Sequence, residues 1–171
     1  MYLHKQPFNI KEIEKTCFNL MAQEWEVERL SKPKLRTYNI FKYQFGVDMY
    51  VSHNVDRFHR SICAQFRSGI LPLLIETGRY TIIKDKDTNR FRNMTVPERV
   101  CPICKSDQVE DEKHFLFECV VYHEDRLVIF QNTEINFNTL MLMTNDDKLI
   151  YFMNTDWKSG LKLLVTLWND L

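Results

Sequence analysis

The sequence predicts a mainly α fold, a multi-helix bundle with a small insertion made of a β-hairpin and a zinc knuckle. Its 171 residues include only four glycines and five prolines, which favours long regular elements over loop-rich β architecture. Hydrophobic residues make up 44% of the chain and aromatic residues 13%, so the chain can bury a core. Apolar residues recur at helical spacing through most of its length.

Two amphipathic helices are expected in the first part of the chain. The first covers residues 10–30, with Asn9 as its N-cap. Its apolar stripe holds Ile10, Ile13, Cys17, Leu20, Met21 and Trp25. Pro33 separates it from a second helix over residues 34–45, which ends at Gly46. The apolar face of this second helix holds Leu35, Tyr38, Phe41 and Phe45.

A third helix is expected to follow Asn54, its predicted N-cap, and to end at Gly69. Its inward residues are predicted to be Val55, Phe58, Ile62, Cys63 and Phe66. Three arginines, spaced three and seven residues apart, form an outward ridge: Arg57, Arg60 and Arg67. The apolar run over residues 70–80 fits either a short helix or a strand. Residues 80–93 are typical of a β-hairpin with its turn near residues 87–89.

Helical patterns return after the hairpin. One helix is expected from Glu112 onward, and two shorter ones occupy residues 135–153. The start signals for the second of these are Asn145, Asp146 and Asp147. The last helix, over residues 156–171, is predicted to have one apolar face made of Leu161, Leu164, Val165 and Trp168. A single domain over residues 1–171 is expected, with helices over 10–68, the hairpin and knuckle over about 78–120 and C-terminal helices over 112–171.

The net charge is zero, but the charge is unevenly distributed. Residues 1–100 carry a net charge of +6 and residues 101–171 carry −6. The most basic segment, residues 29–99, carries +8. A basic region of this size attracts phosphate, which favours a nucleic-acid partner, although a solvated helical surface has the same composition.

Other features bear on the compartment. No apolar run approaches the 18 residues of a membrane span, and the N-terminus lacks the apolar core of a secretory signal. The five cysteines form no disulfide-like framework. A reducing intracellular compartment, nuclear or cytoplasmic, is therefore expected, without a membrane partner.

The cysteines indicate a metal site. The pattern is Cys101-x2-Cys104-x9-His114-x4-Cys119. A Cys-x2-Cys pair at a turn supplies two corners of a tetrahedron, and a following helix can return a histidine and a third cysteine, which together suit Zn²⁺. His123 lies four residues after Cys119, so it is an alternative fourth ligand on the same helical face.

Two non-metal interpretations are weaker. Buried cysteines can serve as small apolar residues, but this pattern is specific in a chain with so few cysteines. A redox dithiol would be expected within a βαβ pattern, which the surrounding sequence lacks.

The segment CPIC, followed after nine residues by HFLFEC, resembles the cysteine–histidine motif downstream of the polymerase in LINE-type, non-LTR retrotransposon reverse transcriptases. LRTYNIFKYQF, HRSICAQFRSGILPLLIETGRY, VCPIC, EDEKHFLFEC and VYHEDR occur in an order that looks like jockey-like elements, over about residues 34–126. The link between Tyr80 and Cys101 is longer than the family leads us to expect. The rest of the chain carries little that is specific.

The resemblance implies both a ligand set and a partner. It maps the motif onto Cys101, Cys104, His114 and Cys119, which favours His114 over His123. It also implies binding of RNA or DNA. Neither a polymerase-type Asp pair nor an endonuclease constellation is present, so a non-catalytic remnant, fragment or domesticated piece of such an element is expected.

The candidate nucleic-acid-binding residues are Arg57, Arg60, Arg67, Arg79, Tyr80, Lys84, Lys86, Arg90, Arg92 and Arg99. The basic side chains would contact phosphates, and Tyr80 together with Phe91 would stack on bases. Packing within the hairpin is an alternative role for both aromatic residues. Arg79 is alternatively an internal partner of Glu76. Acidic residues after Cys101 would repel phosphate, so the zinc itself is alternatively only structural.

The alternative functions are a protein-interaction domain and an enzyme. A protein-interaction domain would use a structural zinc and contact its partner through the apolar C-terminal helix. An enzyme is not expected, because four good ligands leave a zinc ion no open position. The candidate acid–base groups have no motif spacing that joins them: His53, Asp56, His59 and Glu76.

Overall fold

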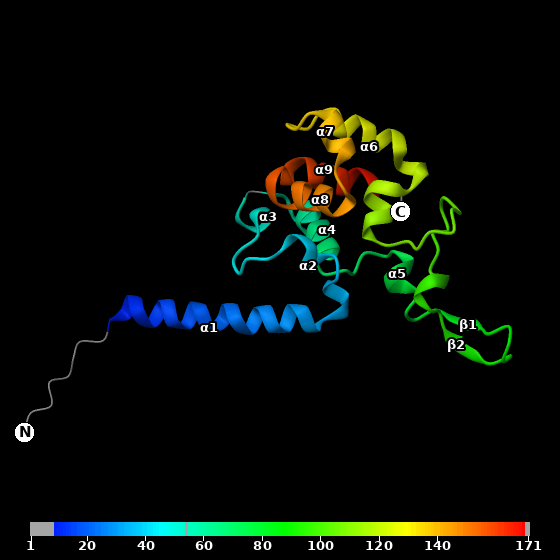
Figure 1. Ribbon diagram of the computed structural model, residues 1–171, viewed down its shortest axis with the longest axis horizontal. Helices are drawn as coiled ribbons and strands as arrows, with labels where there is room; N and C mark the ends of the chain where they lie inside the picture. Colours follow the sequence, from blue (N-terminus) through cyan, green and yellow to red (C-terminus); the bar gives the residue numbers. More distant parts are fainter. Residues whose placement is uncertain (1–8, 54, 170–171) are drawn as a thin grey trace, which may run out of the picture.

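The computed structural model describes residues 9–53 and 55–169, and Figure 1 shows a helical body from which one long helix and one hairpin project. In chain order the larger elements are α1 (Ile10–Ser31), α2 (Tyr38–Phe41), α3 (Met49–Ser52), α4 (Arg57–Arg67), α5 (Leu74–Thr77), β1 (Ile82–Lys84), β2 (Phe91–Asn93), α6 (His123–Phe130), α7 (Phe137–Leu142), α8 (Asn145–Ile150) and α9 (Trp157–Trp168). Single 3-10 turns occupy Pro33–Leu35, Val96–Glu98 and Val120–Tyr122, and π-helical turns occupy His114–Glu118 and Tyr151–Thr155.

The predicted mainly α fold with a small hairpin is confirmed in the described residues. The two strands pair antiparallel, with Ile83 opposite Arg92, and Asn89 adopts a positive φ of 58° in the connecting turn. The run over residues 70–80 resolves as one helical turn, α5, rather than a strand. None of the described helices is both long and apolar enough to cross a membrane.

The C-terminal helix lies in the middle of the body. α9 packs against α4, α6 and the π-turn at Tyr151–Thr155. The buried face of α9 is rotated relative to the predicted one. Leu164 is buried as predicted, together with Leu163 and Leu167, whereas the predicted Leu161, Val165 and Trp168 are only partly buried. Gly160 allows the close approach, since a Cβ there would lie 2.1 Å from the Phe152 carbonyl oxygen.

The first helix forms as predicted, but most of its predicted apolar stripe does not contact the body. Five residues of the stripe are exposed: Ile10, Ile13, Cys17, Leu20 and Met21. The sixth, Trp25, does contact the body: Phe45 lies 5.8 Å from Trp25 and 5.2 Å from Phe18 between ring centroids. Arg29 is buried over the Trp25 ring and donates to the Asn39 side chain at 3.1 Å. Figure 1 shows α1 extending away from the body.

The predicted helix over residues 34–45 was wrong in extent. It is broken into the 3-10 turn Pro33–Leu35 and the single turn α2, and Lys42 is extended after α2. Lys42 forms an ion pair with Asp48 at 2.7 Å and donates to the Gly46 carbonyl at 2.9 Å, so the side chain holds a loop instead of a helix end.

The third predicted helix is α4, with two corrections. Asp56 caps it, with its carboxylate accepting from the His59 amide at 3.1 Å, while Asn54 lies outside the described residues, as do the last two residues of the predicted final helix. Phe58 was predicted to face inward, but it is exposed, whereas Ile62, Cys63 and Phe66 are buried.

Buried carboxylates join distant segments of the chain. Glu112 is 1% exposed and accepts from Arg36 at 2.7 and 2.8 Å and from the Thr37 hydroxyl at 2.9 Å. Glu76 pairs with Lys34 at 2.7 Å and with Arg79 at 2.9 Å. Removing one partner of a buried ion pair is strongly destabilising, because the other charge is left uncompensated.

Replacement of Glu112 by Ala is therefore expected to lower the free energy of unfolding by about 3–5 kcal/mol, because Arg36 and Thr37 lose their common acceptor. Urea unfolding followed by circular dichroism measures this. Glu24→Ala on the exposed face of α1 is the control, with an expected change within about 0.5 kcal/mol. Equal effects of the two substitutions would contradict the structural role of Glu112.

Candidate metal centre

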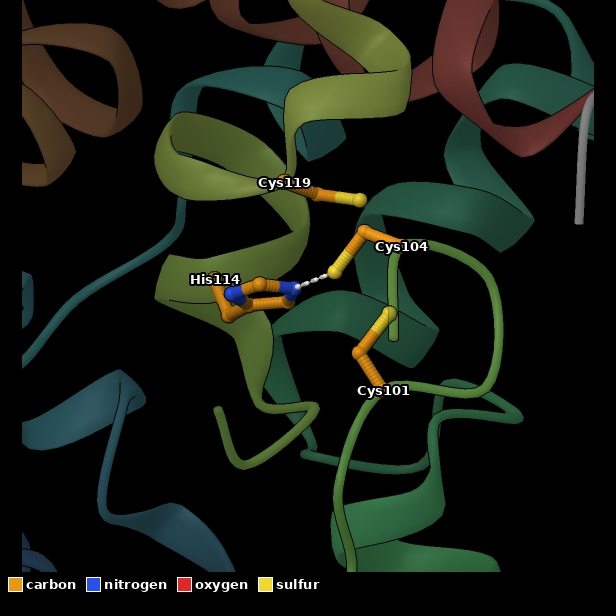
Figure 2. A group of neighbouring side chains, drawn as sticks. All are labelled: Cys101, Cys104, His114 and Cys119. Atoms are coloured by element: carbon orange, nitrogen blue, oxygen red, sulfur yellow. Dashed lines mark hydrogen bonds between the residues drawn. The ribbon is translucent and has the colours of Figure 1, made fainter. Parts of the chain in front are cut away.

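Four side chains converge where the knuckle, residues 101–119, folds back on itself. The sulfur atoms of Cys101, Cys104 and Cys119 and a ring nitrogen of His114 all lie within 4.8 Å of one another. Figure 2 shows the four side chains pointing toward a common centre, two from a loop and two from a helical segment. Cys101, His114 and Cys119 are buried, and Cys104 is partly exposed.

The first pair of ligands lies in a closed turn. An isolated β-bridge joins Val100 to Val109, and the Cys101 amide donates to the Gln108 carbonyl at 2.8 Å. The chain reverses between them through Lys105 and Asp107, whose φ values are 55° and 56°. This closure holds the Cys-x2-Cys segment in one conformation, with both sulfurs on the same side.

The second pair is positioned by a π-helical turn. The Cys119 amide donates to the His114 carbonyl at 2.7 Å, five residues back. In a regular α-helix, residues five apart point roughly 140° away from each other, because each residue turns the helix by about 100°. The wider π-turn reduces this angle and brings both side chains to one side. The Asp111 carboxylate starts the turn by accepting from the His114 amide at 2.9 Å.

The helix predicted from Glu112 onward is therefore interrupted. The backbone of Cys119 has a ψ of 118°, so the chain leaves the helix there and resumes through a 3-10 turn into α6. His123 begins α6 after this break and is exposed. The alternative ligand set with His123 assumed one continuous helical face. The close cluster among the described residues contains His114 instead.

The His114 ring is oriented by a residue that sequence reasoning missed. Its Nδ1 lies 2.9 Å from the Gln108 side-chain oxygen, which accepts the Nδ1 proton. The other nitrogen, Nε2, is then free to bind a metal and lies 3.3 Å from the Cys104 sulfur. Partners of this kind fix the tautomer of metal-binding histidines. Nothing in the spacing of Gln108 indicated this contact.

The three thiols have different acidities. Burial raises the pKa of Cys101 to about 12 and also raises the pKa of Cys119. Burial acts on Cys104 in the same direction, but it is outweighed chiefly by hydrogen bonds from the side chain and amide of Ser106 and from Cys101. The pKa of Cys104 is therefore lowered to about 6.

The donor set fits a tetrahedral thiophilic ion. Zn–S bonds are about 2.3 Å and Zn–N bonds about 2.0–2.1 Å, which puts tetrahedral donors about 3.4–3.8 Å apart. The four donor atoms lie within 4.8 Å of one another, so small side-chain movements would let them share one ion. Mg²⁺ and Ca²⁺ require oxygen ligands, and this cluster offers none.

Several predicted nucleic-acid contacts are engaged inside the fold. Arg67 and Arg99 are buried; Arg67 donates to the Met153 carbonyl at 3.0 Å, and Arg99 donates to the Ile75 carbonyl at 2.8 Å. This burial removes both guanidinium groups from the surface predicted to contact phosphate. The sequence places both residues in a basic segment, but only the fold shows which arginines point inward.

Two further arginines are partly exposed and paired. Arg79 forms the ion pair with Glu76 that was the alternative to a phosphate contact. Arg92 contacts Asp85 at 2.6 Å and Glu98 at 2.7 Å, and it contributes most to lowering the pKa of Glu98 to about 2. Both guanidinium groups therefore already have carboxylate partners.

The remaining candidates are exposed but lie in two places. Arg57 and Arg60 are on α4, which follows α3, and Figure 1 places α3 on the side of the body away from the hairpin. The others lie on the hairpin surface, which we define as six exposed apolar and basic residues of the two strands and their ends: Tyr80, Ile82, Lys84, Lys86, Arg90 and Phe91.

The hairpin surface combines apolar and basic side chains. Phe91 is 75% exposed and Tyr80 is 72% exposed, so neither ring packs within the hairpin. Lys84 pairs with Phe91 in the register and Ile82 is two residues from Lys84, so the three share one face. Ile82 was not among the predicted residues, although its spacing to Lys84 indicates the shared face.

No protein-family model, curated protein or solved structure matches the chain. Interpretation of the metal centre and of the hairpin surface therefore depends on their own geometry and chemistry.

At pH 7, zinc binding is expected to release at least two protons, because the raised pKa values of Cys101 and Cys119 keep both thiols protonated in the metal-free protein. The apparent zinc affinity should therefore rise with pH. Titration calorimetry in two buffers with different ionisation enthalpies gives the proton number. Release of fewer than two protons would show that at least one of these thiols is ionised before zinc binds.

Proposed function

We propose that this chain is a non-catalytic zinc-binding module that binds RNA or DNA through its hairpin surface. The convergence of three cysteines and one histidine supports the metal part of the proposal most directly. Three sulfurs and one imidazole are the donors that structural Zn²⁺ sites use, and all four positions of a tetrahedral ion would be filled. Such a site leaves no open position for substrate or water, which supports a non-catalytic role.

The zinc would hold the knuckle closed, and the knuckle is connected to the hairpin. The Glu110 carboxylate accepts from the Leu74 amide at 2.6 Å, which joins the knuckle to α5. Arg99 donates to the carbonyl of Ile75 in α5 and, at 2.9 Å, to the carbonyl of Met94 at the base of the hairpin. Loss of the metal is expected to loosen this chain of contacts.

The hairpin surface supports the nucleic-acid part of the proposal. Exposed aromatic rings beside lysine and arginine side chains are the arrangement used to stack on unpaired bases and to contact phosphates. Tyr80 and Phe91 supply the rings, and Lys84, Lys86 and Arg90 supply the charges. The acidic residues after Cys101 repel phosphate less than the composition of that segment suggests, because Glu110 and Glu112 are buried.

The resemblance of the motif order to LINE-type reverse transcriptases supports origin from such an element. It also agrees with the expected reducing, intracellular compartment, nuclear or cytoplasmic, in which cysteine thiolates remain available to a metal.

Metal content is expected to be one zinc per chain in wild type. Cys104→Ser and His114→Ala should lose it, because each removes one of four converging donors. His123→Ala is the matched control and should retain the zinc. Mass spectrometry of the intact protein under native conditions distinguishes these cases. Zinc loss in His123→Ala with retention in His114→Ala would reverse the ligand assignment.

Binding of a fluorescent single-stranded oligonucleotide is expected to weaken by about 1–3 kcal/mol in Tyr80→Ala and in Phe91→Ala, since each loses a stacking ring. Lys84→Glu combined with Lys86→Glu should also flatten the dependence of affinity on salt. Fluorescence anisotropy at several salt concentrations measures both effects.

Arg57→Glu combined with Arg60→Glu is the matched charge control and should change this binding much less. If only that pair abolished binding, the contact would lie on α4 instead of on the hairpin surface.

The second candidate function is a protein-interaction or assembly domain with a purely structural zinc. The C-terminal helix is less suited to this role than the sequence indicated, because its most apolar residues are buried in the body. The exposed apolar residues of α1 favour the candidate instead, among them Ile13, Leu20 and Val27. This second function would be favoured if zinc-loaded wild type bound no oligonucleotide but self-associated in light scattering. The self-association should then be lost in Leu20→Glu.

A further inference from the structure

Arg126 is a buried cation beside the metal centre. It lies in α6, is 4% exposed, and its Nη2 donates to the carbonyl oxygen of Cys119. Its Nη1 is also buried and has no hydrogen-bond partner among the described residues. The side chain therefore points its charge at a metal-ligand residue without using its full hydrogen-bonding capacity.

No carboxylate neutralises this charge at close range. None of the ion pairs formed within 4.0 Å by the described residues includes Arg126. A second buried cation, Lys148, is close enough to interact with it unfavourably. Buried charges are normally paired, because an isolated one is costly to remove from water. Asp125 and Glu118 attract Arg126 from beyond ion-pair distance, so no carboxylate of the described residues is paired with it directly.

The metal centre supplies the missing charge. Three cysteine thiolates carry −3, a zinc ion carries +2 and a neutral imidazole carries none, so the occupied centre has a net charge of −1. Cys119 belongs to that centre and accepts directly from Arg126. A buried anion and a buried cation therefore meet at one residue.

We propose that Arg126 is the counter-ion and positioning residue of the metal centre, which rests on the zinc binding proposed above. Its hydrogen bond holds the Cys119 backbone at the point where the chain leaves the π-turn, and its charge offsets the excess negative charge of the occupied site. The contact also joins the centre to α6. Zinc binding is thereby coupled to the docking of α6, since an empty site leaves the guanidinium unpaired.

Four proteins test this: wild type, Arg126→Met, Arg126→Gln and Arg126→Lys. Zinc affinity is measured by competition with a chromophoric chelator, and the stability of the zinc-free protein is measured by urea unfolding. Arg126→Met is expected to bind zinc about 10–100-fold more weakly, as is usual when a group supporting a metal ligand is lost. The stability of its zinc-free form should not fall, because an unpaired buried charge has been removed.

The other two variants separate charge from position. Arg126→Gln keeps a donor for the Cys119 carbonyl but no charge, so it should bind zinc more weakly than wild type. Arg126→Lys keeps the charge and should recover part of the affinity lost in Arg126→Met. If Arg126→Met does not fold without zinc, the zinc affinities of Arg126→Gln and Arg126→Lys still test the role of the charge.

Arg67→Met is the matched control, because Arg67 is also buried and donates to a backbone carbonyl but is paired with Asp48 at 3.2 Å. It should lower stability and leave zinc affinity within about twofold, the scale of an ordinary distant substitution. Wild-type zinc affinity in Arg126→Gln, or equal destabilisation of the zinc-free and zinc-loaded forms by Arg126→Met, would overturn the proposal. Absence of zinc in wild type would instead overturn the proposed function.

Discussion

The main structural constraint on this fold is the convergence of two chain segments at the cysteine–histidine cluster. A closed turn presents Cys101 and Cys104, and a π-turn presents His114 and Cys119, so that four donors come within 4.8 Å. Each segment is shaped for this meeting: one reverses through residues with positive φ, and the other widens its helix to align residues five apart. Both departures from regular structure bring donor atoms toward the same point.

Buried polar contacts then connect the cluster to the rest of the molecule. Glu112 joins the start of the knuckle to Arg36 and Thr37, and Glu110 joins it to α5. Arg126 makes the connection on the other side, from Cys119 to α6. The two carboxylate contacts are weak sources of net stability but costly to break, because the surviving partner stays buried. They therefore specify how the helices, the knuckle and the hairpin are joined.

This arrangement leaves the hairpin projecting from a braced base (Figure 1). Arg99 and the Arg92 ion pairs are used to hold the hairpin and its surroundings, while Lys84, Lys86 and Arg90 remain exposed. Burial and pairing thus engage four of the predicted phosphate contacts, Arg67, Arg79, Arg92 and Arg99, whereas Arg57 and Arg60 on α4 also stay exposed. Rigid support under exposed rings reduces the conformational entropy lost when a flexible partner binds, which suits the proposed contact with unpaired bases.

Several features of this protein follow from local rules and can be predicted from its amino-acid sequence. The long helix α1, the hairpin turn and the spacing of the four candidate ligands follow from periodicity, turn residues and cysteine pattern. Other features depend on the folded chain: most of the apolar stripe of α1 is exposed, the helix after Glu112 breaks at Cys119, and Arg67, Arg99 and Arg126 are buried. The physical reason is that these outcomes depend on partners distant in sequence. Trp25 packs against Phe45, and each of the three arginines donates to a backbone carbonyl. The donor cluster requires His114 and Cys119 on one side. These contacts outweigh the preferences of a single helix.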